Sequence, residues 1–390
     1  MTKQEILLSV SSLTVFRKIL KTDVMKAFIS FLESDTLQQS IYNYGEFVSS
    51  LSGYDMSFSA FLKQSLIEDE NYYIKSVAAE KEVSESVKSN VNAELKILSA
   101  LTEISKNTLW QDIEFSGYVP EFTNKKEDLC AFYLQRAKNI RQCGYGIFAL
   151  HGMFRVENNK IVPVEVADSI SVDCFVGYEQ QRQTVINNTK ALTEGKPAQN
   201  VLLCGDAGTG KSSTVKACAN LFFSQGVRLI ELRKDQLFSL SYVMGAIADN
   251  PLKFIIFIDD LSFNKNDDCF SMLKAVLEGS AESRSGNAVI YATSNRRHIV
   301  KESFADRTGT DDVHRNDTMQ ELLSLSDRFG LTVYYQKPNK ALYLEIVNDL
   351  AKRYNVTMPE NELGIKAEAF ALSRGSRSPR AAEQFIKTLI

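Results

Sequence analysis

The sequence lacks the long apolar segments that a membrane protein needs. Its apolar runs reach about five residues, whereas a membrane-spanning helix requires roughly 18 or more. The first residues, Met1 to Glu5, also lack the charged and then apolar pattern of an export signal. These absences exclude a membrane-spanning protein and indicate a cytoplasmic one.

Proline, paired cysteines and clustered histidines are scarce as well. The chain has 7 prolines, 6 cysteines without a Cys-x-x-Cys pair, and 3 histidines far apart in the sequence. In a chain without an export signal, such cysteines are typical of reduced thiols. No zinc site of histidines and cysteines is therefore expected.

An excess of positive charge is also missing. The formal net charge is −3; residues 1–150 carry 16 basic and 19 acidic side chains, and the remainder carries 29 of each. This balance does not match the strongly basic body of a protein that coats nucleic acid. The hydrophobic fraction of 44% and charged fraction of 24% indicate a globular chain, and 390 residues predict two or three domains.

Hydrophobic periodicity divides the chain into four parts. Spacings of three and four residues predict a helical N-terminal domain over residues 1–145, which we expect to bind a partner or to mediate oligomerisation. A β-rich stretch with turn residues at its centre predicts a β-hairpin linker over 146–170. Alternating strands and helices predict an α/β core over 171–340, and helical periodicity predicts a lid over 341–390. The core strands are expected in near-continuous apolar runs at 201–204, 228–232, 254–258, 288–293 and 331–335.

A phosphate-binding loop follows the first of these core strands. The sequence Gly205-Asp206-Ala207-Gly208-Thr209-Gly210-Lys211-Ser212, followed by Ser213 and a helical pattern, fits G-x-x-x-x-G-K-[ST] in the required context. The glycines permit backbone angles that turn N–H groups toward phosphate oxygens. Lys211 is expected near the β and γ phosphates of ATP, and Ser212 offers a hydroxyl to Mg²⁺.

Two acidic residues end the third core strand. Asp259 is expected to hold Mg²⁺ with Ser212, directly or through water. Asp260 is placed to orient or deprotonate the attacking water. Many ATPases with a phosphate-binding loop carry glutamate at this position. The shorter aspartate predicts weaker hydrolysis or a need for a partner's help. We interpret the nearby pair Asp267-Asp268 as a surface loop.

The next strand, 288–293, ends in polar and basic residues. Asn295 is the candidate to contact the γ-phosphate or the attacking water. Arg296 and Arg297 are open to three interpretations: phosphate contacts, a pair that faces another subunit, or solvated charges. His298 fits a helix cap or a packing residue better than a catalyst.

Taken together, the motifs resemble those of AAA+ ATPases. The segment containing Val176 and Gly177 resembles their adenine-side segment, the turn at Asp327-Arg328-Phe329 resembles their arginine-finger turn, and the segment around Arg380 resembles their second sensor. The resemblance is closest to a bacterial AAA+ group that has long been labelled a domain of unknown function. It covers about 146–390 and rests on the segments at 208–213, 257–263, 291–298 and 324–331.

This resemblance implies roles that the spacing alone does not. Arg328 would reach the ATP of a neighbouring subunit, and Arg380 would contact the ATP of its own, with Arg377 as the competitor for that role. A shared site of this kind implies a head-to-tail homo-oligomer, either a ring or an open helix. The implied fold is a three-layer αβα parallel sheet with a C-terminal helical lid, preceded here by an all-α domain and a β-hairpin.

The sequence therefore predicts an ATP-hydrolysing protein that remodels or loads a macromolecular client. Residues 242–245 miss the pore-loop pattern of threading unfoldases by one residue, and we interpret them as core packing, which favours a loader or switch. A protein client held by the N-terminal domain fits the balanced charge better than nucleic acid. The alternatives are a helicase-loader-like ATPase, a nucleotide-gated scaffold with weak turnover, and a small-molecule kinase, which the arginines at 328 and 380 disfavour.

Overall fold

The structure is a computed structural model that describes residues 2–111, 113–165, 170–261, 268–277, 286–295 and 328–390. The chain divides into two compact units, Met1–Leu150 and His151–Ile390. Within the described residues, none of the helices combines the length and the apolar character needed to cross a bilayer.

The first unit consists of helices, as the apolar spacing predicts. Most of its helices begin at a serine, threonine, asparagine or aspartate whose side-chain oxygen accepts a backbone N–H of the first turn. Such caps supply partners for N–H groups that a helix leaves unpaired. The helices are α1 (Lys3–Ser11), α2 (Asp23–Leu32), α3 (Leu37–Ser50), α4 (Phe58–Glu68), α5 (Tyr72–Ala78), α6 (Glu85–Leu101), α7 (Lys106–Trp110), α8 (Leu129–Lys138) and α9 (Ile140–Cys143).

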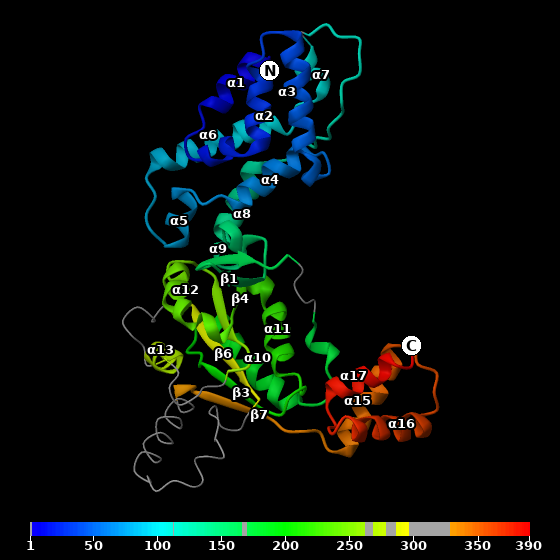
Figure 1. Cartoon of the computed structure of the whole chain (residues 1–390). Helices are drawn as coiled ribbons and strands as arrows, with labels where there is room; N and C mark the ends of the chain where they lie inside the picture. The colour runs from blue at the N-terminus through cyan, green and yellow to red at the C-terminus, as the bar shows by residue number, and fades with distance from the viewer. Residues whose placement is uncertain (1, 112, 166–169, 262–267, 278–285, 296–327) are drawn as a thin grey trace. The chain divides into compact units, whose positions relative to one another are not determined.

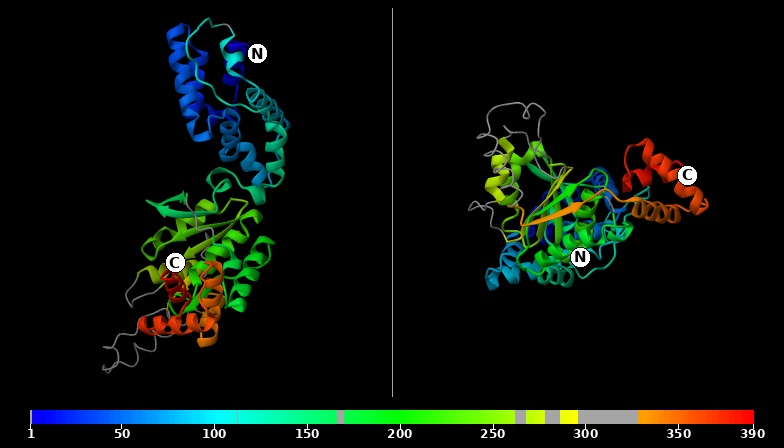
Figure 2. Two further views of the ribbon diagram at one scale, coloured as in Figure 1. Left: turned by 90° about the vertical axis from the view of Figure 1, so that its right-hand side faces the viewer. Right: turned by 90° about the horizontal axis from the view of Figure 1, so that it is seen from below.

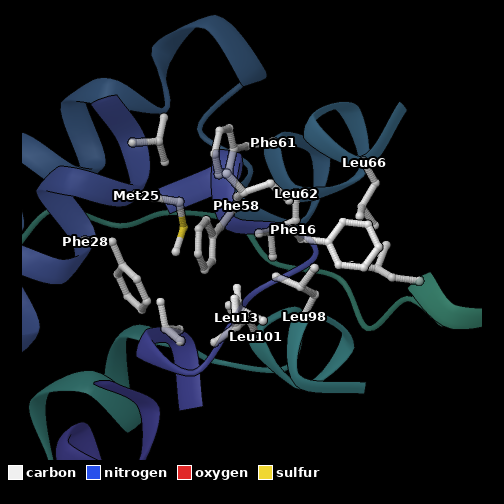
Figure 3. Packing of buried hydrophobic residues seen from close by; sticks show 14 of the residues in the cluster. Leu13, Phe16, Met25, Phe28, Phe58, Phe61, Leu62, Leu66, Leu98 and Leu101 are labelled. Carbon is white, nitrogen blue, oxygen red and sulfur yellow. The ribbon is translucent and has the colours of Figure 1, made fainter. Parts of the chain in front are cut away.

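Aromatic side chains fill the core of this unit. The rings of Phe28, Phe47 and Phe58 pack against one another at centroid distances of 4.9–5.2 Å. Figure 3 shows Phe28 and Phe58 beside Met25, with Phe16 nearby among leucine side chains. These side chains are buried, so apolar packing of helix faces is the main source of stability here.

The second unit is built on a seven-stranded sheet in the order β2-β1-β4-β5-β6-β3-β7. Its strands pair in parallel except for β2, which is antiparallel to β1. Helices α10 and α11 lie on one face of the sheet and α12 and α13 on the other (Figure 1). The strands are β1 (Met153–Glu157), β2 (Lys160–Pro163), β3 (Val201–Gly205), β4 (Val227–Leu232), β5 (Lys253–Ile258), β6 (Ala288–Ser294) and β7 (Leu331–Tyr335).

Helices on both faces and three C-terminal helices complete this unit. The C-terminal helices pack around their own buried core and form the lid, which Figure 2 shows as a group of its own beside the sheet. The predicted fold class, an αβα sheet with a helical lid after an all-α domain and a hairpin, is therefore confirmed. The helices are α10 (Glu179–Thr193), α11 (Lys211–Leu221), α12 (Leu240–Ile247), α13 (Asp268–Leu277), α15 (Lys340–Arg353), α16 (Glu360–Ser373) and α17 (Pro379–Lys387).

The hairpin differs from its prediction in two ways. Its first strand begins at Met153, because Gly144 and Gly146 have positive φ angles and the chain forms a 3-10 turn over Gly146–Ala149. The hairpin is also more than a linker, since β1 pairs in parallel with β4 and extends the main sheet. The interpretation of residues 242–245 as core packing holds for Val243 and Met244, which are buried in α12, whereas Tyr242 is half-exposed.

Candidate functional site

The phosphate loop adopts its turn through glycines at positive φ angles, which residues with side chains rarely adopt. Gly205, Gly208 and Gly210 have φ angles of 137°, 75° and 91°. A side chain at Gly205 would place its Cβ 1.9 Å from the carbonyl oxygen of Tyr335 on β7. Helix α11 begins directly after Gly210, which caps it without a side-chain hydrogen bond. The N–H groups of the first turn are thus suited to bind an anion.

Lys211 is buried at the centre of the loop. Its Nζ donates to the carbonyl oxygens of Gly205 (3.0 Å) and Asp206 (2.7 Å), and to Oδ1 of Asn295 (3.0 Å). Burial lowers the pKa of Lys211, and the nearby Asp206 partly opposes this shift. The ammonium group is therefore held in place by oxygen atoms at the point where a phosphate would pair with its charge.

The carboxylate of Asp259 joins the loop to two strand ends. Its Oδ1 accepts hydrogen bonds from Ser212 Oγ (2.6 Å) and from Thr293 Oγ1 (2.5 Å). The three residues meet because β5 pairs with β6, and β6 pairs with β3, so their carboxyl ends share one edge of the sheet. A hydroxyl and a carboxylate are the hard oxygen donors that Mg²⁺ prefers, so this donor set fits the ion.

Asn295 lies between the lysine and the second acidic residue. Its Nδ2 donates to Asp260 Oδ1 (2.7 Å), while its Oδ1 accepts from Lys211. Asp260 has a left-handed φ of 52°, and its backbone N–H donates to Thr293 Oγ1 (3.0 Å). Such a conformation is uncommon for a residue with a side chain and occurs often at functional sites.

A cavity of about 650 Å³ opens beside these residues. Its volume lies in the range of ligand pockets. Both predicted metal ligands line it, as do Asp260 and Asn295. The other predicted residues in its lining are Val176, Ala207, Gly208, Thr209, Gly210, Lys211, Ser213 and Arg380.

Four predicted site residues do not line the cavity in the described part of the chain. Gly177 packs under Leu342, and Gly205 is covered by the backbone of β7. The carboxylate of Asp206 faces away and accepts the N–H of Lys337 (3.1 Å). Arg328 is exposed shortly before β7. Its predicted role concerns a neighbouring subunit and stays a prediction.

The lid places Arg380 rather than Arg377 at the cavity. The N–H of Arg380 donates to the carbonyl oxygen of Gly208 (3.3 Å), so the start of α17 contacts the phosphate loop. Arg377 instead forms a two-pronged ion pair with Glu368, with distances of 2.8 and 2.7 Å. These bonds lower the pKa of the Glu368 carboxyl, and they leave the cavity to Arg380.

Several cavity residues were missed by the sequence analysis. Thr293 is one, although its place at the end of a predicted strand, two residues before Asn295, was an available signal. The others of interest come from one face of α15, whose spacing of three and four residues was visible but had no motif to mark it. They are Ile346, Asp349, Leu350, Arg353 and the adjoining Tyr354.

Some predictions concern residues outside the described ranges. Arg296, Arg297 and His298 belong to this group, as do Asp267 and the first part of the arginine-finger turn, residues 324–327. In the part of the chain that the structure describes, no group of three or more histidine, cysteine, aspartate or glutamate side chains is arranged to hold a metal ion. A metal ion at this site would be coordinated by Ser212, Asp259 and oxygen atoms of the bound ligand.

The family model described as "Protein of unknown function (DUF815)" matches residues 149–390. The chain belongs to this family. The DUF815 region coincides closely with the second unit, which contains the sheet, the phosphate loop and the lid. The mostly parallel sheet and the helical lid of this unit match the fold that the resemblance to AAA+ proteins implies.

Among solved structures, similar chains come from RuvB of Thermotoga maritima. Two mutant forms each show 16% identity and a TM-score of 0.37, over 56% of this chain and 63% of theirs. The matched part is thus less than two thirds of their length. The structure described as the RuvB Holliday junction branch migration motor shows 12% identity and a TM-score of 0.34, over 56% of this chain and 72% of its own. No curated protein matches the sequence.

Proposed function

We propose that this protein binds and hydrolyses ATP and uses the nucleotide state to remodel or load a macromolecular client. The observation that carries the proposal is the position of Asp259, which accepts hydrogen bonds from the phosphate-loop Ser212 and from Thr293. This contact brings the loop and the strand ends together in the arrangement needed to hold a phosphate and its metal.

The cavity offers a distinct place for each part of the substrate. The N–H groups at the start of α11 and the ammonium group of Lys211 suit the phosphates. Ser212 and Asp259 would hold Mg²⁺, which neutralises charge on the phosphates when it is bound. The far end is lined by Phe175, Val176 and the apolar residues of α15, and suits the base.

Asp260 and Asn295 are the residues that we propose for water activation. In hydrolysis, the oxygen of water bonds to the γ-phosphorus, the bond from that phosphorus to the bridging oxygen breaks, and the water gives up a proton. The Asp260 carboxylate is the proposed acceptor of this proton, and the hydrogen bond from Asn295 orients it. Arg328 of a neighbouring subunit would offset charge that develops on the transferred group.

A head-to-tail homo-oligomer with a protein client on the N-terminal unit completes the proposal. Hydrolysis would shift the lid relative to the sheet, because Arg380 joins the lid to the phosphate loop at Gly208. Moving the lid changes the surface that each subunit presents to the next one. The assembly and the client stay predictions until they are measured in solution.

Lys211→Ala tests the proposed site. The variant should lose ATP binding by at least about a hundredfold, because the loss removes a charge-assisted contact to phosphate. Its circular dichroism spectrum and melting temperature should stay close to those of the wild type. Wild-type turnover in a correctly folded variant would contradict the site.

A mixing experiment tests the shared site. Arg328→Ala should bind ATP and fail to hydrolyse it, and Asp260→Asn should do the same for a different reason. In a mixed oligomer, a subunit with intact Asp260 can meet a neighbour with intact Arg328, so part of the activity should return. The absence of activity at every mixing ratio would argue against a site shared between subunits.

The short side chain of Asp260 is also compatible with an alternative function. Its carboxylate is already engaged by Asn295 at 2.7 Å, an arrangement that also suits a nucleotide-gated scaffold with weak turnover. Tight ATP binding with negligible phosphate release by the wild type would favour the scaffold. DNA binding that weakens steeply with salt would instead favour a nucleic-acid-associated ATPase.

A further inference from the structure

The base-side wall of the cavity contacts both the lid and the helices that cover the sheet. This wall is the segment 172–176, which contains the 3-10 turn Val172–Cys174. Val176 packs against the hydrophobic core of the lid. Phe175 faces Arg182 of α10, whose guanidinium lies 5.7 Å from the ring centroid, whereas Val176 contacts the C-terminal helices.

Arg353, at the end of α15, holds this wall by its backbone. Its guanidinium donates to the carbonyl oxygens of Cys174 (2.5 Å) and Asp173 (3.2 Å). Its Nε lies 2.5 Å from Oδ2 of Asp349, one turn earlier on the same helix. The rigid, forked shape of a guanidinium suits such simultaneous contacts, which a lysine cannot reproduce.

The chain turns sharply directly after the wall. Gly177 and Tyr178 have consecutive left-handed φ angles of 73° and 60°. Beyond this point the chain belongs to the sheet, since Tyr178 packs against the core there and its ring lies 5.2 Å from that of Tyr335. The Tyr178 hydroxyl donates to the carbonyl oxygen of Gln336 (2.6 Å), in the segment that leads from β7 into the lid.

We propose that Arg353 is a positioning residue that links the base-side wall to the lid and so sets the position of the wall against the nucleotide base. This inference rests on the proposed function, because it assigns the base end of the same nucleotide site. Arg353 is expected to act on the base through the wall and not on the phosphates.

This separation between base and phosphates defines the experiment. The probes are Mg-ATP and inorganic tripolyphosphate, whose binding to the full-length protein is measured by calorimetry. Arg353→Ala should weaken ATP binding about tenfold, as expected for the loss of charge-assisted hydrogen bonds. Its affinity for tripolyphosphate should stay within about twofold of the wild type, because that probe has no base. In turnover assays, KM should rise more than kcat falls.

Two further variants make the result specific. Lys352→Ala removes the same charge from the adjacent helix position, which does not line the nucleotide cavity, and should bind both probes normally. Arg353→Lys keeps the charge but not the fork, and should show an intermediate loss of ATP affinity. If the alanine variant fails to fold, Arg353→Lys still tests the proposal.

The outcomes distinguish this inference from the proposed function. Equal loss of both probes in Arg353→Ala, or no loss of either, would overturn the positioning role. Wild-type protein that binds neither probe would instead refute the proposed function. Lys211→Ala serves as the reference for losing both probes together.

Discussion

Two carboxylates in different units have opposite roles. Glu94 in the helical unit is buried and accepts hydrogen bonds from Thr14 N (2.8 Å), Thr14 Oγ1 (2.5 Å), Val15 N (3.0 Å) and Phe16 N (3.0 Å). Asp259 in the DUF815 unit accepts hydrogen bonds from two hydroxyl groups and lines a cavity. Groups of its own chain satisfy the hydrogen-bonding capacity of the Glu94 carboxylate, whereas the Asp259 carboxylate lies where a ligand can reach it.

The difference shows how to separate a structural charge from a functional one. A buried charge that is surrounded by partners from its own chain stabilises the fold, and removing it leaves those partners unpaired. A charge that faces a cavity with few partners is available to a substrate. Three experiments sharpen this contrast, beginning with the largest expected effect.

Glu94→Ala should destabilise the helical unit by about 3–5 kcal/mol, because it leaves buried N–H groups without acceptors. Denaturant unfolding at equilibrium measures the change. Nucleotide affinity of the folded protein should remain unchanged, since the cavity lies entirely within the other unit. Glu94→Gln keeps one acceptor oxygen and should cost less. An unfolding free energy within about 0.5 kcal/mol of the wild type would contradict the structural role.

Asp259→Asn should have the opposite effects, a large loss of turnover and a small loss of stability. We expect turnover of Mg-ATP to fall about a hundredfold, which corresponds to about 2.7 kcal/mol, because the metal loses a charged ligand. The unfolding free energy should change by less than about 1 kcal/mol, since the asparagine oxygen can still accept from Ser212 and Thr293. Rate assays over a range of Mg²⁺ concentrations measure the effect. Wild-type rates at low Mg²⁺ would show that Asp259 does not hold the ion.

The smallest expected effect concerns pH. Burial lowers the pKa of Lys211, and a bound triphosphate would raise it, so binding should take up a proton at alkaline pH. Affinity for ATP should therefore fall as pH rises through the pKa of the free protein, below that of an exposed lysine. The folding stability of the nucleotide-free protein should depend on pH with the opposite sign. The unfolded chain keeps the Lys211 proton to a higher pH than the folded chain does, so the free energy of unfolding should rise with pH between the unfolded-state and folded-state pKa values.

Calorimetry at alkaline pH in two buffers of different ionisation enthalpy measures this proton uptake. The expected result is that the apparent binding enthalpy depends on the buffer, together with an affinity loss of up to about tenfold per pH unit above the midpoint. Affinity that stays constant across the titration range of an ordinary lysine would mean that the charge of Lys211 does not contact the phosphates.

The local parts of the site could be predicted from the sequence. The phosphate loop occupies consecutive residues, so its spacing identifies it, and buried parallel strands appear as short apolar runs such as 254–258. The order of the strands depends on contacts between distant segments, which no local pattern encodes. The pairing of β5 with β6, which brings Thr293 to Asp259, became clear only in the fold.

Tertiary contacts also decided between residues that looked alike in the sequence. Arg380 was the predicted second sensor and Arg377 its competitor, and the fold separates the two because Arg377 forms an ion pair with Glu368. Arg353 had no motif at all, because its partners are backbone carbonyl oxygens 179 and 180 residues away. Backbone acceptors leave no trace in the amino-acid sequence.

The central claim is that the phosphate loop and the end of β5 together grip a metal-bound nucleoside triphosphate. The most direct test is a crystal structure of the full-length protein with Mn²⁺ and a non-hydrolysable ATP analogue, in which anomalous scattering locates the metal. The account predicts the metal beside Ser212 Oγ and Asp259, with the phosphates over residues 208–212 and the base against the wall that Arg353 holds. An analogue bound elsewhere, or a metal far from Asp259, would contradict it.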